Sequence, residues 1–203
     1  MPAPWTRECE DESSFDEYLP LELQPKSCVH FTPIAIARRA ARLLAPRAGM
    51  RILDVGSGVG KFCIIAAHEV PDATFVGGEQ RHHLVHVATR LAERWSVPNA
   101  TFVHGDVFAL DWSEFDGFYL FNPFAEQLFK PWQVIDETVE SKPKAFIRQV
   151  AVAYHRLANA RTGTRVVTHH GFGTPLPPGY ELVRDDPPGP PSVKLWVKGH
   201  DRR

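Results

Sequence analysis

The stretch ILDVGSGVGKF, residues 52–62, decides the fold because it joins a short apolar run to a glycine-rich turn and then to a helix-forming run. Glycines in this order let the backbone turn sharply, approach a ligand closely and point the amides of a helix N-terminus at it. The dinucleotide-binding pattern G-x-G-x-x-G is broken, because Lys61 stands three residues after Gly58. The triphosphate-binding pattern G-x-x-x-x-G-K-[ST] does not occur either. The loop therefore disfavours nicotinamide, flavin and nucleoside triphosphate ligands.

Strand-like and helix-like runs alternate along the rest of the chain. The predicted strands are RILDV (51–55), ATFVGGE (73–79), TFVHGD (101–106), DGFYLF (116–121), TGTRVVTHH (162–170), YELVRDD (180–186) and SVKLWVKGH (192–200). The predicted helices cover residues 34–45, 61–70, 80–95 and 144–160. Mostly continuous apolar strands between helices predict an α/β three-layer sandwich, with a mostly parallel seven-stranded sheet and a C-terminal antiparallel hairpin.

Two local patterns refine this topology. Thr32 and Pro33 have the form of an N-cap and a first helical residue, so they predict where the first long helix begins. Only the eight residues GFGTPLPP (171–178) separate the fifth strand from the sixth, whereas a parallel crossover needs about a dozen or more. Either the helix before the sixth strand is missing, or that strand pairs differently. The turn-rich PPGPP lies between the last two strands and would close the hairpin.

The N-terminal residues differ in composition from the rest. Residues 7–22 hold seven acids against one base, a balance typical of an exposed and in part disordered arm. We therefore expect an acidic arm over residues 1–28 and a single domain over residues 29–203. The arm could dock a basic partner, and a solvated tail is the alternative.

Composition constrains the partners. A net charge of −1 and a pI near 6.8 provide no bulk attraction to nucleic acid or to an anionic membrane, so both are disfavoured as partners. Three cysteines are too few for a disulfide framework or a zinc cluster, and no run reaches the roughly 18 apolar residues of a membrane helix. We expect a soluble cytoplasmic protein with reduced thiols. His82 and His86 have a spacing usable for a metal but lack the glutamate of H-E-x-x-H, so no metal site is predicted.

The glycine loop resembles the first motif of class I S-adenosylmethionine-dependent methyltransferases, D-x-G-x-G-x-G, which runs here from Asp54 to Gly60. The resemblance implies a Rossmann-like fold with S-adenosylmethionine as cofactor and S-adenosylhomocysteine as product. It also implies that Glu79, at the end of FVGGE, holds the ribose hydroxyls and that Asp106, in HGDVF, meets the adenine amino group. Alternatively, Asp54 is a turn cap, Glu79 a surface acid and Asp106 an Asx-turn residue. The full cofactor-binding set implied is Asp54, Gly56, Ser57, Gly58, Gly60, Glu79, Gln80, Asp106, Val107 and Asn122.

The fourth predicted strand ends on Asn122-Pro123-Phe124, which resembles the Asn-Pro-Pro-aromatic motif of amino-group methyltransferases with one proline fewer. These three residues are the predicted catalytic residues. The Asn122 oxygen and the carbonyls around Pro123 would accept hydrogen bonds from an amine, and Phe124 would line or stack on the substrate. The alternative is that Asn122 and Pro123 cap the strand.

The wider pattern of DVGSGVGKF, VGGE, HGD and FYLFNPF covers about residues 30–170 and looks closer to a bacterial group of small methyltransferase-fold proteins. That group is distantly similar to histone-lysine methyltransferases outside the SET class. The implied activity is methyl transfer by direct in-line displacement to a nitrogen of a protein side chain or small molecule. His30, His169 and His170 are candidate bases near the acceptor. A cofactor-binding module without turnover, serving as a sensor or partner subunit, is the alternative.

Overall fold

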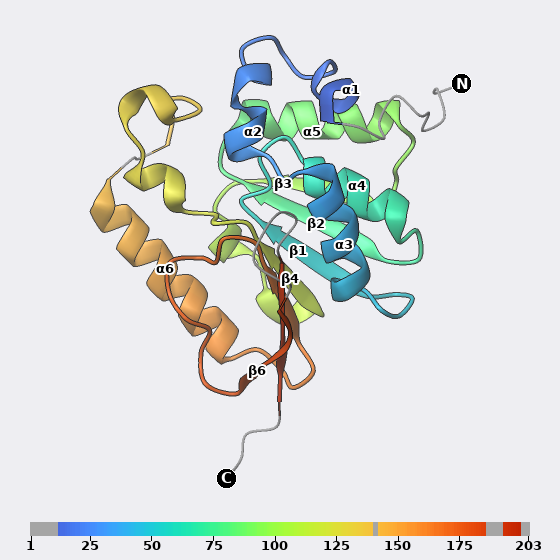
Figure 1. Ribbon diagram of the computed structural model, residues 1–203, viewed down its shortest axis with the longest axis vertical. Helices are drawn as coiled ribbons and strands as arrows, with labels where there is room; N and C mark the ends of the chain where they lie inside the picture. The colour runs from blue at the N-terminus through green and yellow to red at the C-terminus, as the bar shows by residue number, and fades with distance from the viewer. Residues whose placement is uncertain (1–11, 140–141, 186–192, 200–203) are drawn as a thin grey trace.

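Seven strands form one sheet in the computed structural model, which describes residues 12–139, 142–185 and 193–199 (Figure 1). The strands are β1 (Arg51–Val55), β2 (Thr74–Glu79), β3 (Ala100–His104), β4 (Gly117–Leu120), β5 (Arg165–Thr168), β6 (Tyr180–Asp185) and β7 (Lys194–Lys198). Their order is β3-β2-β1-β4-β5-β7-β6. The first five strands in this order are parallel, and β7 is antiparallel to both of its neighbours. The predicted sheet and its closing hairpin are confirmed.

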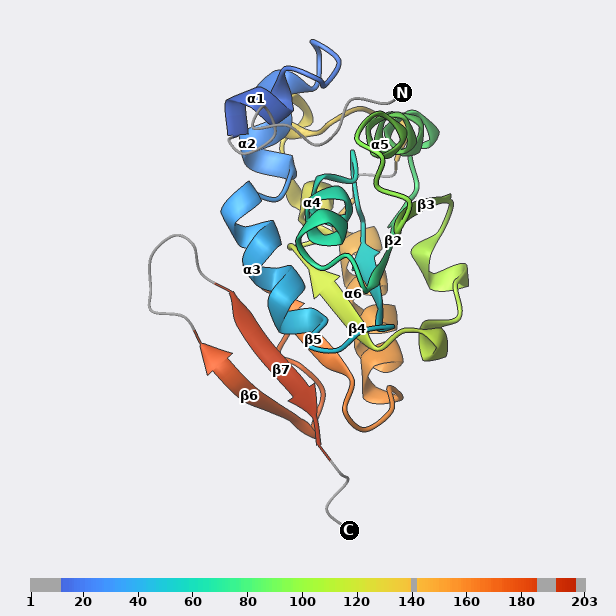
Figure 2. The ribbon, with the colours of Figure 1, turned by 90° about the vertical axis from the view of Figure 1, so that its right-hand side faces the viewer.

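Helices cover both faces of the sheet. The longer helices are α3 (Ile34–Leu44), α4 (Lys61–Glu69), α5 (His82–Arg94) and α6 (Pro143–Ala158). Helices α3, α4 and α5 lie on one face and α6 on the other (Figure 2). Successive residues of β4 face the two layers: Tyr119 stacks on Phe62 of α4 at 3.9 Å between ring centroids, and Phe118 stacks on Trp112 at 4.7 Å. Two apolar cores, one on each face, therefore hold the layers together.

The connection from β5 to β6 has no helix. Residues 169–179 form turns and extended chain, so the missing crossover helix is confirmed. β6 nevertheless runs in the same direction as β5, because both strands are antiparallel to β7, which lies between them. PPGPP (187–191) lies outside the described residues.

The predicted cap of α3 is wrong. Pro33 is the residue at the N-cap, and it provides no side-chain hydrogen bond. The Thr32 hydroxyl donates instead to the Tyr119 hydroxyl at 3.2 Å, inside the core. The amide of Ile34, the first residue of α3, donates to a carboxylate oxygen of Glu12. A distant acid therefore provides the acceptor that a local threonine was expected to provide.

The N-terminal residues do not form a free arm over their described part. Short helical segments run through it: α1 (Glu12–Asp16), η2 (Gln24–Lys26) and α2 (Ser27–His30). Phe15, Leu19 and Leu23 from this stretch are buried in the core that contains α3 and α4. The acid content of the stretch predicted exposure from residue 12 onward. That prediction took no account of the apolar residues, which pack on the domain. Residues 1–11 lie outside the described residues.

Candidate active site

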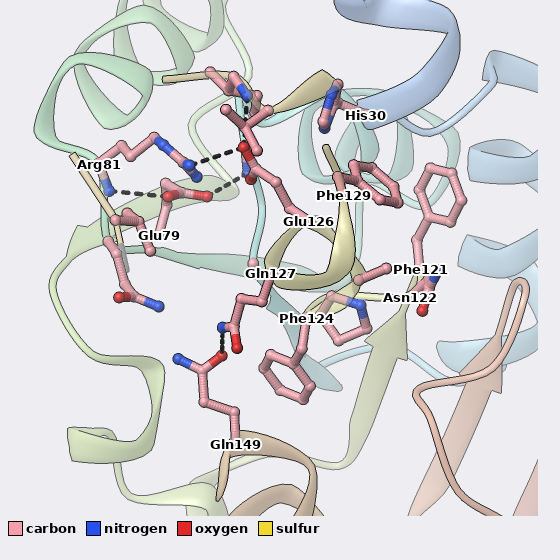
Figure 3. Close-up of a pocket in the computed structure, with 18 of the residues that line it drawn as sticks. His30, Glu79, Arg81, Phe121, Asn122, Phe124, Glu126, Gln127, Phe129 and Gln149 are labelled. Atoms are coloured by element: carbon pink, nitrogen blue, oxygen red, sulfur yellow. Dashed lines mark hydrogen bonds and ion pairs between the residues drawn. The ribbon is translucent and has the colours of Figure 1, made fainter. Parts of the chain in front are cut away.

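A cavity lies at the sheet edge where the parallel strands β1 to β4 end. Carboxyl ends of parallel strands meet at one edge, so the loops after these strands converge there (Figure 3). Four connections contribute to the lining: the glycine loop, the residues after β2, the residues after β3 and the segment after β4. Of the predicted site residues, those that line it are Gly56, Gly58, Glu79, Gln80, Val107, Asn122, Pro123 and Phe124.

The glycine loop adopts a backbone shape that other residues rarely take. Gly56, Gly58 and Gly60 have φ values of 80°, 55° and 74°. The amides of Gly56 and Ser57 both donate to the Gly78 carbonyl of β2 at 3.0 Å, which fixes the loop against the sheet. Gly60 is the N-cap of α4, so the helix begins directly behind the loop.

Glu79 ends β2 with its carboxylate beside the glycine loop (Figure 3). One oxygen accepts from the Gly58 amide at 3.0 Å and the other from the Arg81 amide at 2.9 Å. Burial raises the pKa of Glu79, while the Arg81 amide and charge and the Gly58 amide act in the opposite direction. Each carboxylate oxygen retains a further lone pair, so the group can still accept two hydrogen bonds from a diol.

The segment after β4 meets the glycine loop. A methyl group added at Gly56 would lie 3.5 Å from both the Cβ and the carbonyl oxygen of Pro123. Asn122 has a φ of 43°, an uncommon backbone shape for a residue other than glycine, and its amide donates to the Gly171 carbonyl at 3.0 Å. The predicted donor-binding and acceptor-binding motifs thus lie in contact. Phe124 lines the cavity but is 5% exposed and packs in the core on the α6 side.

Four other predicted cofactor residues do not line the cavity: Asp54, Ser57, Gly60 and Asp106. Asp54 is buried behind the loop, where its carboxylate accepts from the Cys63 thiol at 3.7 Å. The Asp106 side chain accepts from the Phe108 amide at 2.9 Å, an Asx-type contact, although its neighbours Gly105 and Val107 both line the cavity. Their assignment as cofactor ligands remains a prediction.

Residues 126–136 of the segment after β4 form part of the cavity wall, and we call them the cover. The bonds that hold the cover involve residues that the sequence did not point to. Arg81, which is 8% exposed, donates through Nε to Asp136 at 3.0 Å. Through a terminal nitrogen it also donates to Glu126 at 2.9 Å (Figure 3). These bonds fasten the segment after β4 to the residues that follow β2. On the far side of the cavity, Gln127 of the segment after β4 donates a hydrogen bond to Gln149 of α6. Nothing in the local sequence pairs residues so far apart.

Among the three candidate bases, His30 lines the cavity and His169 and His170 do not. The Nε2 of His30 lies 2.8 Å from the Gln133 carbonyl, so in the neutral ring Nε2 carries the proton. Burial lowers the pKa of His30, with the Gln133 contact acting in the opposite direction. Its ring is therefore neutral near pH 7.

Within residues 12–139, 142–185 and 193–199, no group of three or more histidines, cysteines or acids is placed to hold a metal ion. None of the helices in those ranges has the length and apolar character that a bilayer-spanning helix requires.

Solved methyltransferase structures share this fold. An RNA methyltransferase from Salinibacter ruber in complex with S-adenosyl-L-homocysteine matches with a TM-score of 0.58 and 23% identity, over 85% of this chain and 95% of that one. TrmN from Thermus thermophilus matches with a TM-score of 0.61 and 22% identity, over 86% of this chain and 52% of that one. At these identities the likeness establishes the fold.

A curated relative extends the comparison to sequence. The 23S rRNA (uracil(1939)-C(5))-methyltransferase RlmD of Nitrosospira multiformis is 29% identical over an alignment of 149 residues that covers 65% of this chain. The alignment covers 33% of the relative, so this chain spans about a third of that protein's length.

The prediction that nucleic acid is disfavoured as a partner is wrong. The curated relative is named as an rRNA methyltransferase and the Salinibacter ruber protein as an RNA methyltransferase. The prediction depended on a net charge of −1, and a net charge does not exclude a local surface suited to RNA.

The family is established by a direct match. The family model described as a methyltransferase domain matches residues 46–158, which is more than half of the 203 residues. The match contains the glycine loop, Glu79 and the Asn122-Pro123-Phe124 motif. The predictions of a methyltransferase and of S-adenosylmethionine as its methyl donor are confirmed. This chain therefore belongs to the methyltransferase domain family.

Proposed function

We propose that this protein transfers the methyl group of S-adenosylmethionine to a nitrogen atom held beside Asn122. The observation that carries the proposal is the contact between Gly56 and Pro123, because it brings the glycine loop and the end of β4 to one cavity. We assign the cofactor to the residues predicted from the sequence, with Glu79 as the ligand of the ribose hydroxyls. The donor set suits the group: a carboxylate for a diol, and the apolar side chains of Val107 and Phe31 for a flat ring.

Positioning is the main task of the protein in this reaction. The bound cofactor supplies an activated methyl group on a sulfonium, which is already a good leaving group. Asn122 would accept a hydrogen bond from the amine through its side-chain oxygen and so aim the nitrogen lone pair. Transfer of the methyl group to that nitrogen would form the carbon–nitrogen bond, break the carbon–sulfur bond and leave the positive charge on nitrogen. The free Nδ1 of neutral His30 would accept the proton that then leaves.

RNA is the acceptor class that the observations favour. The curated relative and one similar structure are named as RNA methyltransferases. Trp132, in the cover, is 74% exposed, and the Lys130 ammonium lies 5.1 Å from its ring centroid. An exposed aromatic ring beside a cation can stack on an unpaired base while the cation meets a phosphate. The acids Glu12 and Asp16 are bonded to Lys61, so this part of the N-terminal stretch is not free to recruit a basic protein.

A labelled-methyl assay tests the function. The folded protein is incubated with labelled S-adenosylmethionine and a cell lysate separated into RNA, protein and small-molecule fractions. We expect nuclease-sensitive label in RNA from the wild type. Label in protein would instead support the protein side-chain acceptor that the resemblance to histone-lysine methyltransferases implies. Label among small molecules would support a small-molecule acceptor. Cofactor binding without any transfer would favour a binding module and contradict the proposal.

Two variants test the role of Asn122. Asn122→Ala should lower turnover by about 100-fold and weaken S-adenosylhomocysteine binding much less, because the contact assigned to its side-chain oxygen is made to the acceptor. Asn159→Ala, at the end of α6, is the matched control and should leave turnover unchanged. Full turnover by Asn122→Ala would exclude the proposed role.

A further inference from the structure

Lys61 is a buried cation that the proposed methyl transfer does not use. It is 2% exposed, although it is the first residue of α4 and follows the glycine loop directly. Its Nζ donates to Glu12 at 2.6 Å, to Asp16 at 2.9 Å and to the Ser27 hydroxyl at 3.4 Å. An ammonium has three donors, so all three are satisfied. A lysine is rarely buried so completely unless it is paired in this way.

These acceptors belong to the N-terminal stretch, and each is tied to a further element. The second oxygen of Glu12 accepts from the Ile34 amide at the start of α3. Asp16 also accepts from the Ser27 hydroxyl at 2.7 Å, which joins α1 to α2. The Phe15 ring lies 4.8 Å from the Lys61 ammonium and is fully buried. Lys61 is thus the point at which two N-terminal elements, α1 and α2, join the helix behind the glycine loop.

The stretch fastened in this way continues into the cavity wall. Val29, His30 and Phe31 all line the cavity. The Phe31 ring lies so close to the loop that a methyl group on Gly58 would be 3.2 Å from it. From the same stretch, His30 contacts the Gln133 carbonyl at 2.8 Å and Lys26 donates to the Val134 carbonyl. The N-terminal stretch and the segment after β4 therefore meet over the site.

The cavity between the N-terminal stretch and the cover is small. It encloses about 120 Å³, whereas pockets that hold a ligand of this kind have roughly 300–1,000 Å³. A ligand of that size would therefore require the cover to shift as it enters.

We propose that Lys61 is a positioning residue that holds residues 12–31 as one wall of the cofactor site. The inference rests on the proposed function, because it concerns the same cofactor. If the contacts of Lys61 strengthen cofactor binding, then by thermodynamic linkage the bound cofactor stabilises those contacts by the same free energy. Cofactor affinity should then depend on Glu12 and Asp16, although neither residue lines the cavity.

A matched pair of variants tests this with calorimetry. Glu12→Gln removes one charged partner of Lys61 at a residue whose side chain is half exposed, so the fold should survive. It should weaken S-adenosylhomocysteine binding about tenfold, the change expected for one charged hydrogen bond. Glu17→Gln makes the same change of charge in the same stretch at an exposed residue and should bind like the wild type. Equal affinity of Glu12→Gln and wild type would overturn the proposal.

Hydrogen exchange supplies the second readout. S-adenosylhomocysteine should slow exchange of the amides of residues 12–31 in the wild type, and Lys61→Met should lose that protection while β1 and β4 keep theirs. Unchanged exchange in residues 12–31 of a wild type that binds the ligand would overturn the proposal that Lys61 holds these residues as a wall, and it would leave the proposed function standing. A wild type that binds no ligand would overturn the proposed function, and the wall with it.

Discussion

The Glu79 carboxylate accepts a hydrogen bond from the Gly58 amide at 3.0 Å, so the acid at the end of β2 supports the glycine loop beside which it lies. This relationship gives Glu79 two roles. It shapes the glycine loop, and it presents lone pairs to a bound diol. A substitution there should therefore affect ligand binding more than the loss of a surface acid would.

Glu79→Gln should weaken S-adenosylhomocysteine binding by about 10- to 100-fold. The carboxamide offers one acceptor oxygen in place of two, and its NH2 group would face the Gly58 or the Arg81 amide, which are both donors. Calorimetry measures the change. Glu114→Gln, at an exposed residue near the amino end of β4, is the control and should bind normally. A wild-type affinity for Glu79→Gln would show that another group holds the ribose.

Asp54 should make stability depend on pH in an unusual direction. Burial raises its pKa from 3.8 to about 8; the Cys63 thiol acts against this and the nearby Glu79 adds to it. Between these two values the folded protein holds a proton that the unfolded chain releases. The stabilisation is complete below the unfolded value and is lost as pH rises toward the folded value, by at most about 1.4 kcal/mol per pH unit.

Urea unfolding of Asp54→Asn tests this relationship. The amide cannot ionise, so the wild type should lose free energy of unfolding relative to Asp54→Asn as the pH rises from about 5 to about 8. Asp72→Asn, at an exposed residue, should run parallel to the wild type over the same range. Parallel curves for Asp54→Asn and wild type would mean that Asp54 is ionised in the folded protein.

Arg81→Met should loosen the cover. Arg81 is the buried partner of both Glu126 and Asp136, whose side chains are 19% and 26% exposed. Without it, residues 126–136 should open more often, by about 1–3 kcal/mol in the free energy of local opening. Hydrogen exchange of that segment measures the change. Arg42→Met, which removes an exposed ion pair with Glu69, should leave the segment unchanged. Unaltered exchange in Arg81→Met would show that apolar packing alone holds the cover.

The sheet could be predicted from the sequence because its signals are local. RILDV, its glycine turn and KFCIIAAHEV are adjacent in the chain, and each carries the period or the breaker of its element. The convergence of Glu79 and Asn122 followed from strand order alone, since parallel strands place their carboxyl ends together.

The bonds that hold the cover and the N-terminal stretch could not be predicted because they join residues that are far apart in sequence. Lys61 lies 49 residues from Glu12, and Arg81 lies 55 residues from Asp136. In the sequence Lys61 stands out only as a departure from the dinucleotide pattern, and its three partners lie in the N-terminal stretch. For the same reason the acidic stretch looked like a free arm, since composition reports charge but not the buried cation that the charges surround.

Gly60→Ala should destabilise the fold more than Gly49→Ala does. Both glycines have positive φ, 74° and 78°, so alanine adds a backbone cost of about 1–2 kcal/mol at either position. A methyl group at Gly49 would meet nothing within 4 Å. At Gly60 it would lie 2.5 Å from the Phe102 ring and 2.8 Å from the Ala88 Cβ, so overpacking should add about 1–3 kcal/mol. Urea unfolding of the two variants separates the terms, because their difference contains the packing contribution alone. An equal loss at both positions would mean that β3 and α5 move aside, and that Gly60 is required for its backbone shape and not for the close approach of α5 to the loop.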